Sequence, residues 1–476
     1  MELASIVDLV NGWVWGTPLV VLCLGAGVFF SFWTRFLQVR HIKDMVTQLW
    51  QGKTSESGIS SFQGFAMALG GRVGTGNIAG VATAIAMGGP GALFWMWVIA
   101  FLGAGSAFIE SALAQVWKEK VDGQYVGGPA YYIERGLKMK WYAVLFAATT
   151  VVSCGFLLPG IQSNSIATAF QGAFRVPMWV SGLFTTALLG LVIFGGVKRI
   201  GRVAELAVPF MALGYLLMAL AIVIIDFRRV PEMLALIFSS AFGAHAAFGG
   251  IAGSAIAWGV KRGIFSNEAG QGTGPQAAAA AEVAHPAQQG LVQAFSVYVD
   301  TLGVCTATGI MLLLTGQYNV ADGKGGFLTQ NLPGVEHGPA YTQLAVDTVL
   351  PGFGSAFVAV ALFFFAFTTI MAYAYYAESN VDYLLRGRST RWGIRAIRVV
   401  LLAMTFFGSV RTVGLAWAMG DIGVGLMAWL NILAILALGK VGVKVLRDYE
   451  EQVKAGKPLS FDPAKLGIPD TACWKT

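Results

Sequence analysis

The chain has 476 residues, of which 56% are hydrophobic and only 12% are charged, with 61 glycines and a formal net charge of +7. This composition excludes an ordinary soluble domain and indicates one polytopic helical membrane protein. The basic residues lie between apolar runs, where they set membrane orientation, so the positive charge does not indicate a nucleic-acid partner.

The apolar runs predict eleven transmembrane helices, with an uncleaved first span rather than a signal peptide. In chain order they are centred near residues 15–34, 61–86, 91–116, 141–172, 177–195, 203–225, 233–259, 291–315, 345–384, 394–410 and 413–438. The run at 345–384 is longer than the about 20 residues that one span needs. We expect it to enter the bilayer near the turn sequence LPGFG at 350–354.

The distribution of lysine and arginine predicts a multi-pass protein of the plasma membrane with its N-terminus outside and its C-terminus in the cytoplasm. In this orientation the inner loops and the tail hold 26 of the 32 basic residues, with Lys261 and Arg262 counted in an inner loop. Cys23, Cys154, Cys305 and Cys473 have no C-x-x-C spacing, so neither a disulfide framework nor a metal site is expected.

A glycine-rich stretch, ALGGRVGTGNIAGVATAI at 68–85, interrupts the predicted second span. Glycine makes a continuous helix costly, and a broken helix in hydrocarbon needs protein or a water-filled cavity around its free backbone groups. We therefore expect unwinding around 73–76 and a binding site there. Close helix packing through small residues is the alternative, and the polar amide of Asn77 favours the binding site.

A short internal repeat links this stretch to the seventh run. GNIAGVA at 76–82 is similar to GGIAGSA at 249–255, five spans further on. An odd offset makes the second copy enter the membrane from the opposite side, as an inverted repeat requires. Chance similarity between glycine- and alanine-rich helices is the alternative. Paired broken helices at corresponding positions are typical of the binding site of a secondary transporter.

Two long motifs are similar to those of the alanine or glycine:cation symporter family, the sodium:alanine symporters. They are GGRVGTGNIAGVATAIAMGGPGALFWMW at 70–97 and KRGIFSNEAGQGTGPQAAAAAEVAHPAQQGLVQAFSVYVDT at 261–301. The resemblance implies an all-α integral membrane fold like that of the leucine transporter, with a five-plus-five inverted repeat and one extra N-terminal helix. On the predicted spans, the single transporter domain 1–476 then consists of the extra helix 15–34, the repeats 61–227 and 233–440, and a cytoplasmic tail 441–476.

The same resemblance implies symport of a small neutral amino acid, alanine or glycine, with sodium as the coupling ion and no other cofactor. A proton-coupled transporter and an uncoupled channel for small neutral solutes are the alternatives. The sequence contains no H-E-x-x-H or G-x-S-x-G motif, so we do not expect an enzyme.

The substrate site is expected at the two glycine-rich segments. An amino-acid zwitterion needs N–H donors for its carboxylate and carbonyl oxygens for its ammonium group. Backbone N–H groups freed near residue 75 suit the carboxylate, and carbonyls near residue 249 suit the ammonium. By resemblance, Gln162 lines the pocket, and a helix–helix hydrogen bond is its alternative role. The expected substrate-binding residues are Thr75, Gly76, Asn77, Gln162, Phe248, Gly249 and Gly250.

Sodium needs several oxygen ligands. The resemblance implies one ion between the hydroxyls of Thr368 and Thr369 and the carbonyls of Gly70 and Val73. It places a second sodium position at Asn77, near the substrate carboxylate. For the two threonines the alternative is a hydrogen bond to the preceding helical turn, which is common in membrane helices.

Four carboxylates lie in predicted spans, where they are costly enough to need a role. Asp300 either neutralises sodium near Asn77 or accepts hydrogen bonds from the broken seventh helix. We expect Glu110 to tether the broken second helix, Asp421 to pair with a basic gate residue, and Glu378 to lie at the cytoplasmic boundary.

Two further features have open interpretations. His245 is the only histidine in a predicted span, and we expect a buried, neutral, hydrogen-bonded ring rather than a proton-coupling group. The segment 261–290 is rich in small residues, and it forms either part of an inner gate or an interfacial cytoplasmic helix over its alanine run.

Overall fold

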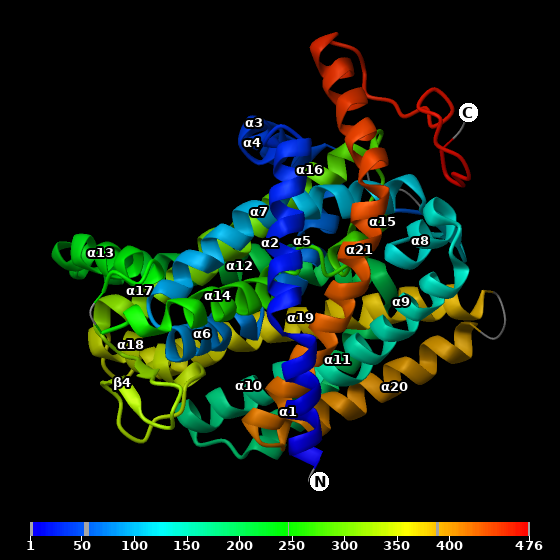
Figure 1. Cartoon of the computed structure of the whole chain (residues 1–476). Coiled ribbons are helices and arrows are strands. Elements are labelled where there is room, and N and C mark those ends of the chain that lie inside the picture. Colours follow the sequence, from blue (N-terminus) through cyan, green and yellow to red (C-terminus); the bar gives the residue numbers. More distant parts are fainter. Residues whose placement is uncertain (1–2, 52–56, 246, 387–389, 475–476) are drawn as a thin grey trace.

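A computed structural model describes residues 3–51, 57–245, 247–386 and 390–474, and the fold is almost entirely helical (Figure 1). The first half contains α1 (Leu3–Val14), α2 (Thr17–Trp33), α3 (Leu37–Arg40), α4 (Ile42–Thr47), η1 (Gln48–Trp50), α5 (Ser61–Arg72), η2 (Gly76–Gly80), α6 (Val81–Gly88), α7 (Gly91–Val116), β1 (Glu119–Val121), β2 (Gln124–Val126), α8 (Pro129–Leu137), α9 (Lys140–Val152), η3 (Ser153–Leu157), α10 (Leu158–Phe174), α11 (Met178–Ile193), α12 (Gly196–Ile225) and η4 (Phe227–Arg229).

The second half is also mostly helical. It contains α13 (Val230–Ala241), η5 (Gly249–Ile251), α14 (Ala252–Asn267), α15 (Gly274–Ala280), α16 (Pro286–Val297), η6 (Tyr298–Cys305), α17 (Thr306–Thr315), β3 (Asn319–Ala321), β4 (Phe327–Gln330), α18 (Pro339–Val349), α19 (Gly354–Leu385), α20 (Thr390–Ser409) and α21 (Val413–Lys454). The strands form two small antiparallel hairpins, β1–β2 and β3–β4.

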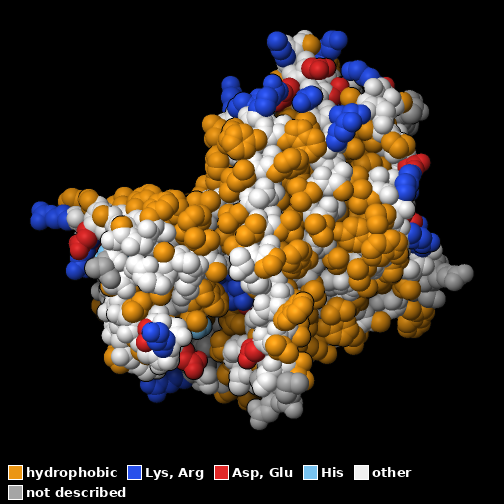
Figure 2. Space-filling model, in the orientation of Figure 1, with side chains coloured by type: hydrophobic (Ala, Val, Ile, Leu, Met, Phe, Trp, Pro, Cys, Tyr) orange, Lys and Arg blue, Asp and Glu red, His pale blue; other side chains and the backbone are white. Residues whose placement is uncertain are grey.

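Eight helical segments of the described residues are long and apolar enough to cross a bilayer. They are Ser5–Trp33, Gly91–Val116, Lys140–Phe174, Gly196–Ile225, Pro286–Thr315, Gly354–Leu385, Thr390–Ser409 and Val413–Lys454. Hydrophobic side chains cover the flank of the molecule, and many lysine and arginine side chains gather at the end that carries the C-terminus (Figure 2). The N-terminus lies at the opposite end (Figure 1).

The first glycine-rich stretch breaks its helix as predicted. α5 begins at a capping box, in which the Ser60 hydroxyl accepts the Gln63 N–H and the Ser60 N–H reaches the Gln63 side chain. The helix ends at Arg72, and the next residue has a non-helical backbone (φ −75°, ψ 87°). The chain then continues through the π-helical turn η2 into α6.

A second broken helix lies at 252–280 rather than at the predicted 233–259. α13 ends at Ala241, and α14 then runs past Lys261 and Arg262 to Asn267. The break follows at 268–273, where Gly270 (φ 81°) and Gly272 (φ 91°) have left-handed backbones that favour glycine. The prediction was wrong because the two basic residues resemble a membrane exit, whereas Arg262 is buried in α14.

The segment 261–290 is therefore not a loop, and its alanine run is not an exposed interfacial helix. The alanines form α15, which is fully buried and packs against α5 and α7. The similar motifs at 76–82 and 249–255 also do not mark corresponding positions in the two broken helices. Residues 249–251 form the short turn η5 ahead of α14, well before the break at 268–273.

Two other runs differ from simple spans. The run at 345–384 is divided as predicted, since α18 ends at Val349 and α19 begins at Gly354. α21 continues sixteen residues beyond the predicted end at 438, to Lys454, and projects from the bundle (Figure 1).

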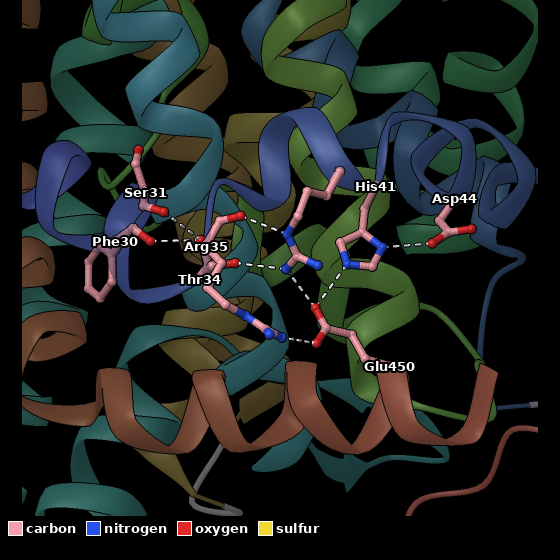
Figure 3. Close-up of polar contacts among 8 residues, drawn as sticks. Phe30, Ser31, Thr34, Arg35, His41, Asp44 and Glu450 are labelled. Carbon is pink, nitrogen blue, oxygen red and sulfur yellow. Dashed lines mark hydrogen bonds and ion pairs between the residues drawn. The ribbon is translucent and has the colours of Figure 1, made fainter. Parts of the chain in front are cut away.

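Charged side chains hold the projecting end of α21 to the turn after α2 (Figure 3). The Glu450 carboxylate accepts hydrogen bonds from Arg40 at 2.7 Å and from the His41 ring at 3.0 Å, and it also pairs with Arg35. The other nitrogen of His41 lies 2.7 Å from Asp44. The turn that follows α2 is thus fastened to α21.

α10 and α20 approach closely through glycine. A Cβ atom at Gly408 would overlap the backbone of Gly160. The Asn164 amide also donates to the Gly408 carbonyl oxygen at 3.0 Å, which fixes the register of the two helices. The atoms in contact are backbone atoms of both helices, so no flexible side chain could move to make room for a methyl group.

We predict that Gly408→Ala destabilises the protein by about 1–3 kcal/mol, because the added methyl group forces two packed helices apart. Gly214→Ala in α12 is the matched control, since its Cβ atom would meet nothing within 4 Å. Thermal unfolding of the detergent-solubilised protein measures both variants. A Gly408→Ala protein that melts with the wild type would contradict the close approach.

Candidate substrate and sodium site

The two broken helices meet in the buried centre of the bundle. A Cβ atom at Gly76 would lie 3.1 Å from the Phe265 ring and 3.2 Å from Ser266 Cα, so η2 packs against the end of α14. Both breaks are within a few residues of this contact. The predicted residues Thr75, Gly76 and Asn77 are fully buried here.

Side chains satisfy the N–H groups that the first break frees. The Gly74 N–H donates to Asn77 Oδ1 at 2.8 Å, and the Thr75 N–H donates to Gln162 Oε1 at 3.0 Å. Gln162 lies on α10, so the amide bridges α10 to the unwound turn. A small anionic group that replaced these two amide oxygens would meet N–H donors at the start of a helix.

Five oxygen atoms gather on the other side of the first break. The Thr369 hydroxyl contacts the carbonyl oxygens of Gly70 at 2.9 Å and Val73 at 3.4 Å, and the Thr368 hydroxyl contacts that of Gly70 at 3.3 Å. Both hydroxyls also lie 3.0 Å from the Phe365 carbonyl oxygen in their own helix, α19. Both hydroxyls thus make the hydrogen bond to the preceding turn that the alternative expects, Thr368 also to the Phe364 carbonyl oxygen at 3.0 Å. The sodium position stays a prediction, and Phe365 is an oxygen that the sequence did not reveal. An all-oxygen set of this kind suits a hard cation.

Asp300 lies at the junction of both broken helices. Its carboxylate accepts hydrogen bonds from the Asn77 amide at 2.7 Å, from the Ser266 hydroxyl at 3.0 and 3.1 Å, and from the Thr301 hydroxyl at 2.7 Å. The contact from Ser266 of α14 is the hydrogen bond that one interpretation of Asp300 expects. Every one of these partners is neutral, so the carboxylate can still act on a cation.

Arg72 and Glu268 are buried charges that the sequence analysis did not place in the site. Arg72 donates through Nη1 to the Gln293 side chain at 3.0 Å, while its Nε and Nη2 atoms have no partner among the described residues. Glu268 Oε2 accepts the Thr273 hydroxyl at 2.8 Å, and Oε1 has no such partner. Glu268 was overlooked because its segment was taken for a loop.

The structure corrects the role of Glu110. The sequence analysis assigned it to the broken second helix, but it contacts the other break. Its Oε1 atom accepts the Gly270 N–H at 3.2 Å, and its Oε2 atom accepts the Asn431 amide at 2.7 Å. The reason is geometric, because the 268–273 break lies beside α7 once α14 extends to Asn267.

Phe248, Gly249 and Gly250 lie apart from the first break. The Phe248 ring stacks on His245 with centroids 4.9 Å apart, and Gly249 packs against the Gly243 carbonyl. Gly250 is exposed. All three residues precede α14. We expected them to face the first break, but residues 265–266 lie next to Gly76 instead. His245 is only partly buried and accepts the Ala247 N–H, in a turn rather than in a span.

The two remaining carboxylates are paired. Asp421 forms a two-pronged ion pair with Arg262, at 2.8 and 2.7 Å, and also contacts Lys261 at 2.8 Å, so the predicted pairing with a basic residue is confirmed. Glu378 makes a similar pair with Arg398, at 2.7 Å for both bonds, and so joins α19 to α20.

The position of Lys261 and Arg262 inside α14 also changes the count of basic residues. Without these two, the predicted inner loops and tail contain 24 of the 32 lysines and arginines in the sequence.

A cavity of about 680 Å³ opens next to this ion pair, between α1, α6, α14, α21 and the β3–β4 region (Figure 2). Arg262 lies at its base, with its guanidinium group 4.5 Å from the Trp417 ring and 5.5 Å from the Phe265 ring. Phe265 in turn contacts Gly76. One layer of aromatic rings and a paired arginine therefore separates the cavity from the two breaks.

Comparison with known proteins relates the whole chain to one family of transporters. The profile of the sodium:alanine symporter family matches residues 1–463. The chain is 58% identical to YrbD of Bacillus subtilis (strain 168), over 99% of this chain and 98% of that protein. It is 53% identical to the "Sodium/proton-dependent alanine carrier protein" of Bacillus sp. (strain PS3), over 90% and 97% of the two chains. It is 37% identical to the "Sodium/alanine symporter AgcS" of Methanococcus maripaludis, over 95% and 98%.

Solved structures with low sequence identity share the fold. MhsT in complex with L-phenylalanine superposes with a TM-score of 0.56 at 14% identity, over 83% of this chain and 97% of that chain. A substrate-bound, outward-open Na⁺-coupled sialic acid symporter superposes with a TM-score of 0.53 at 12% identity, over 97% and 95%. The fold is therefore leucine-transporter-like. The chain is a multi-pass membrane transporter rather than an enzyme, and it belongs to the sodium:alanine symporter family.

Proposed function

We propose that this protein is a secondary symporter that moves alanine, and glycine as a smaller substrate, into the cell together with sodium by alternating access. The observation that carries the proposal is the pair of broken helices with five oxygens beside the first break. Relatives named as alanine carriers, at 53% and 37% identity over most of their length, support the substrate class.

The proposed substrate site uses the first break for the carboxylate of the amino acid. The expected N–H groups of Thr75 and Gly76 would bind the carboxylate together with that of Gly74. Gln162 would release the Thr75 N–H and Asn77 would release the Gly74 N–H when the substrate arrives. The ammonium group would face the second break at 268–273, which replaces the expected carbonyls at 248–250. Phe265 and Ser266 pack tightly against Gly76, which supports a substrate with a small side chain.

Sodium would bind at two places in this proposal. The first is the oxygen set of Gly70, Val73, Thr368 and Thr369, to which we add the Phe365 carbonyl. The second lies at Asn77 and Asp300, where a carboxylate with neutral partners would meet the ion and the substrate carboxylate. A proton-coupled carrier is the alternative, and uptake driven by a proton gradient in sodium-free vesicles would favour it.

We propose eleven membrane crossings, which are the eight long segments, the broken helices 61–88 and 252–280, and α11. α2 is then the extra N-terminal helix, the first repeat covers 61–227, and the second begins at 252 instead of 233. The layer of Arg262, Trp417 and Phe265 would be the outer gate, with the cavity above it as the entrance from outside.

We predict that Thr369→Val raises the sodium concentration for half-maximal uptake roughly tenfold or more, because it removes one oxygen from the ion. Its alanine affinity should recover at saturating sodium, since linkage couples the two ligands by one shared factor. Asn77→Ala should weaken alanine binding even at saturating sodium. Alanine affinity across a sodium titration measures both effects.

Thr405→Val is the matched control for this experiment. Thr405 is a buried threonine of α20 whose hydroxyl bonds to the Leu401 carbonyl of its own helix. It should keep the sodium dependence of the wild type. Wild-type sodium dependence in Thr369→Val would rule out the proposed ion position.

The proposed orientation predicts the labelling of two introduced cysteines. Lys324→Cys lies in the β3–β4 turn and should react with an impermeant thiol reagent in intact cells, whereas Lys454→Cys at the end of α21 should react only after permeabilisation. Both positions are exposed, so access to the reagent depends on the side of the membrane. Reversed labelling would overturn the orientation.

A further inference from the structure

Four buried groups form a closed hydrogen-bond network around Gly270, in the second break. The Gly270 N–H donates to Glu110 Oε1 at 3.2 Å, and the Gly270 carbonyl oxygen accepts the Asn431 amide at 2.9 Å. The same Asn431 nitrogen donates to Glu110 Oε2 at 2.7 Å, and the Tyr132 hydroxyl donates to Asn431 Oδ1. Both backbone polar groups of Gly270 are thus held by side chains from α7 and α21.

This network requires two acceptor oxygens on the side chain at position 110. Glu110 accepts one hydrogen bond at each oxygen, from a backbone N–H and from an amide, and a glutamine could accept at only one of these positions. Glu110, Asn431 and Tyr132 are all completely buried. A buried carboxylate with neutral hydrogen-bond partners is costly, so its presence at the break calls for a role that offsets the cost.

Gly270 is also one of the residues that set the path of the break. Its left-handed backbone (φ 81°) turns the chain between α14 and α15, and its Cβ position lies 3.1 Å from Ile432 of α21. On either side of it, Glu268 Oε1 and both polar atoms of Gln271 are buried without a partner among the described residues. The network therefore fixes the backbone between two side chains that are free to meet a ligand.

We propose that Glu110 and Asn431 are positioning residues for the substrate site, which hold the 268–273 break in the shape that receives the ammonium group. The inference rests on the proposed function, because it assumes that this break faces the substrate. Glu110 and Asn431 act through Gly270 and do not touch the substrate. Since they belong to α7 and α21, they also attach the second break to two unbroken helices.

The test compares Glu110→Gln with the wild type in the purified full-length protein. The glutamine keeps the size of the side chain, but its NH₂ group would face one of the two donors and could not accept a hydrogen bond from it. Alanine affinity at saturating sodium should fall about tenfold. The sodium-induced rise in melting temperature without alanine should keep its wild-type midpoint, since the first break is intact. A purely structural role would lower the melting temperature and leave alanine affinity unchanged.

Matched variants separate the network from its surroundings. Ser111→Ala changes the neighbouring buried residue of α7 and should bind alanine like the wild type. The double variant Glu110→Gln with Asn431→Ala should lose no more affinity than the worse single variant, because either change opens the same network. If Glu110→Gln does not fold, Tyr132→Phe removes the outermost hydrogen bond and should weaken alanine binding by a smaller factor.

The outcomes distinguish this inference from the proposed function. Wild-type alanine affinity in folded Glu110→Gln, or additive losses in the double variant, would overturn the positioning role. If the wild type itself does not bind alanine, the proposed substrate is wrong, and the same variants are compared on whichever standard amino acid stabilises the wild type. An equal loss of sodium and alanine binding would also overturn the inference, because it would show a general collapse of the bundle.

Discussion

The structure depends on one constraint, which is that backbone groups freed by a broken helix need partners where no bulk water is present. At the first break these partners are amide and hydroxyl side chains, and at the second they are a carboxylate and amides. Asn77 and Asn267 belong to the broken helices, and each of the other four partners comes from a different neighbouring helix, so the two breaks are tied to α7, α10, α19 and α21. The partners are Asn77, Gln162 and Thr369 for the first break and Glu110, Asn267 and Asn431 for the second.

Buried charge gives a physical reason for a cation to accompany the substrate. Asp300, Glu268 and Glu110 lie around the second break, and Arg72 is the buried cation nearest to them. No ion pair joins Arg72 to any of the three carboxylates within the described part of the chain. One guanidinium can neutralise only one of these groups, and every further ionised carboxylate is costly in a medium of low dielectric constant. A cation that enters with a neutral zwitterion offsets that cost and favours the ionised form.

The sequence predicted the first break well and the second poorly, for a clear physical reason. Glycines and an amide at 70–80 are local signals, and they located the break between α5 and η2. The second break was misplaced because Lys261 and Arg262 end an apolar run in the sequence. Their partner Asp421 lies 159 residues from Arg262 in the sequence, so no local sequence pattern could reveal this ion pair. The carboxylates Glu110 and Glu268 were misjudged for the same reason, since their roles follow from where α14 ends.

The two breaks share hydrogen-bond partners, which bears on how ion and substrate binding are coupled. Asn77 of η2 and Ser266 of α14 both donate to the Asp300 carboxylate, and both also contact Cys305 Sγ, so a change at the first break reaches the second through shared side chains. Asn77 Oδ1 also accepts the Gly74 N–H, beside the Val73 carbonyl of the oxygen set. A ligand that draws Asn77 away from either partner alters both breaks together. Two binding sites are coupled when both ligands shift the equilibrium of one shared structural element. Asn77 is such an element, since it contacts Gly74 in the first break and Asp300 between the breaks.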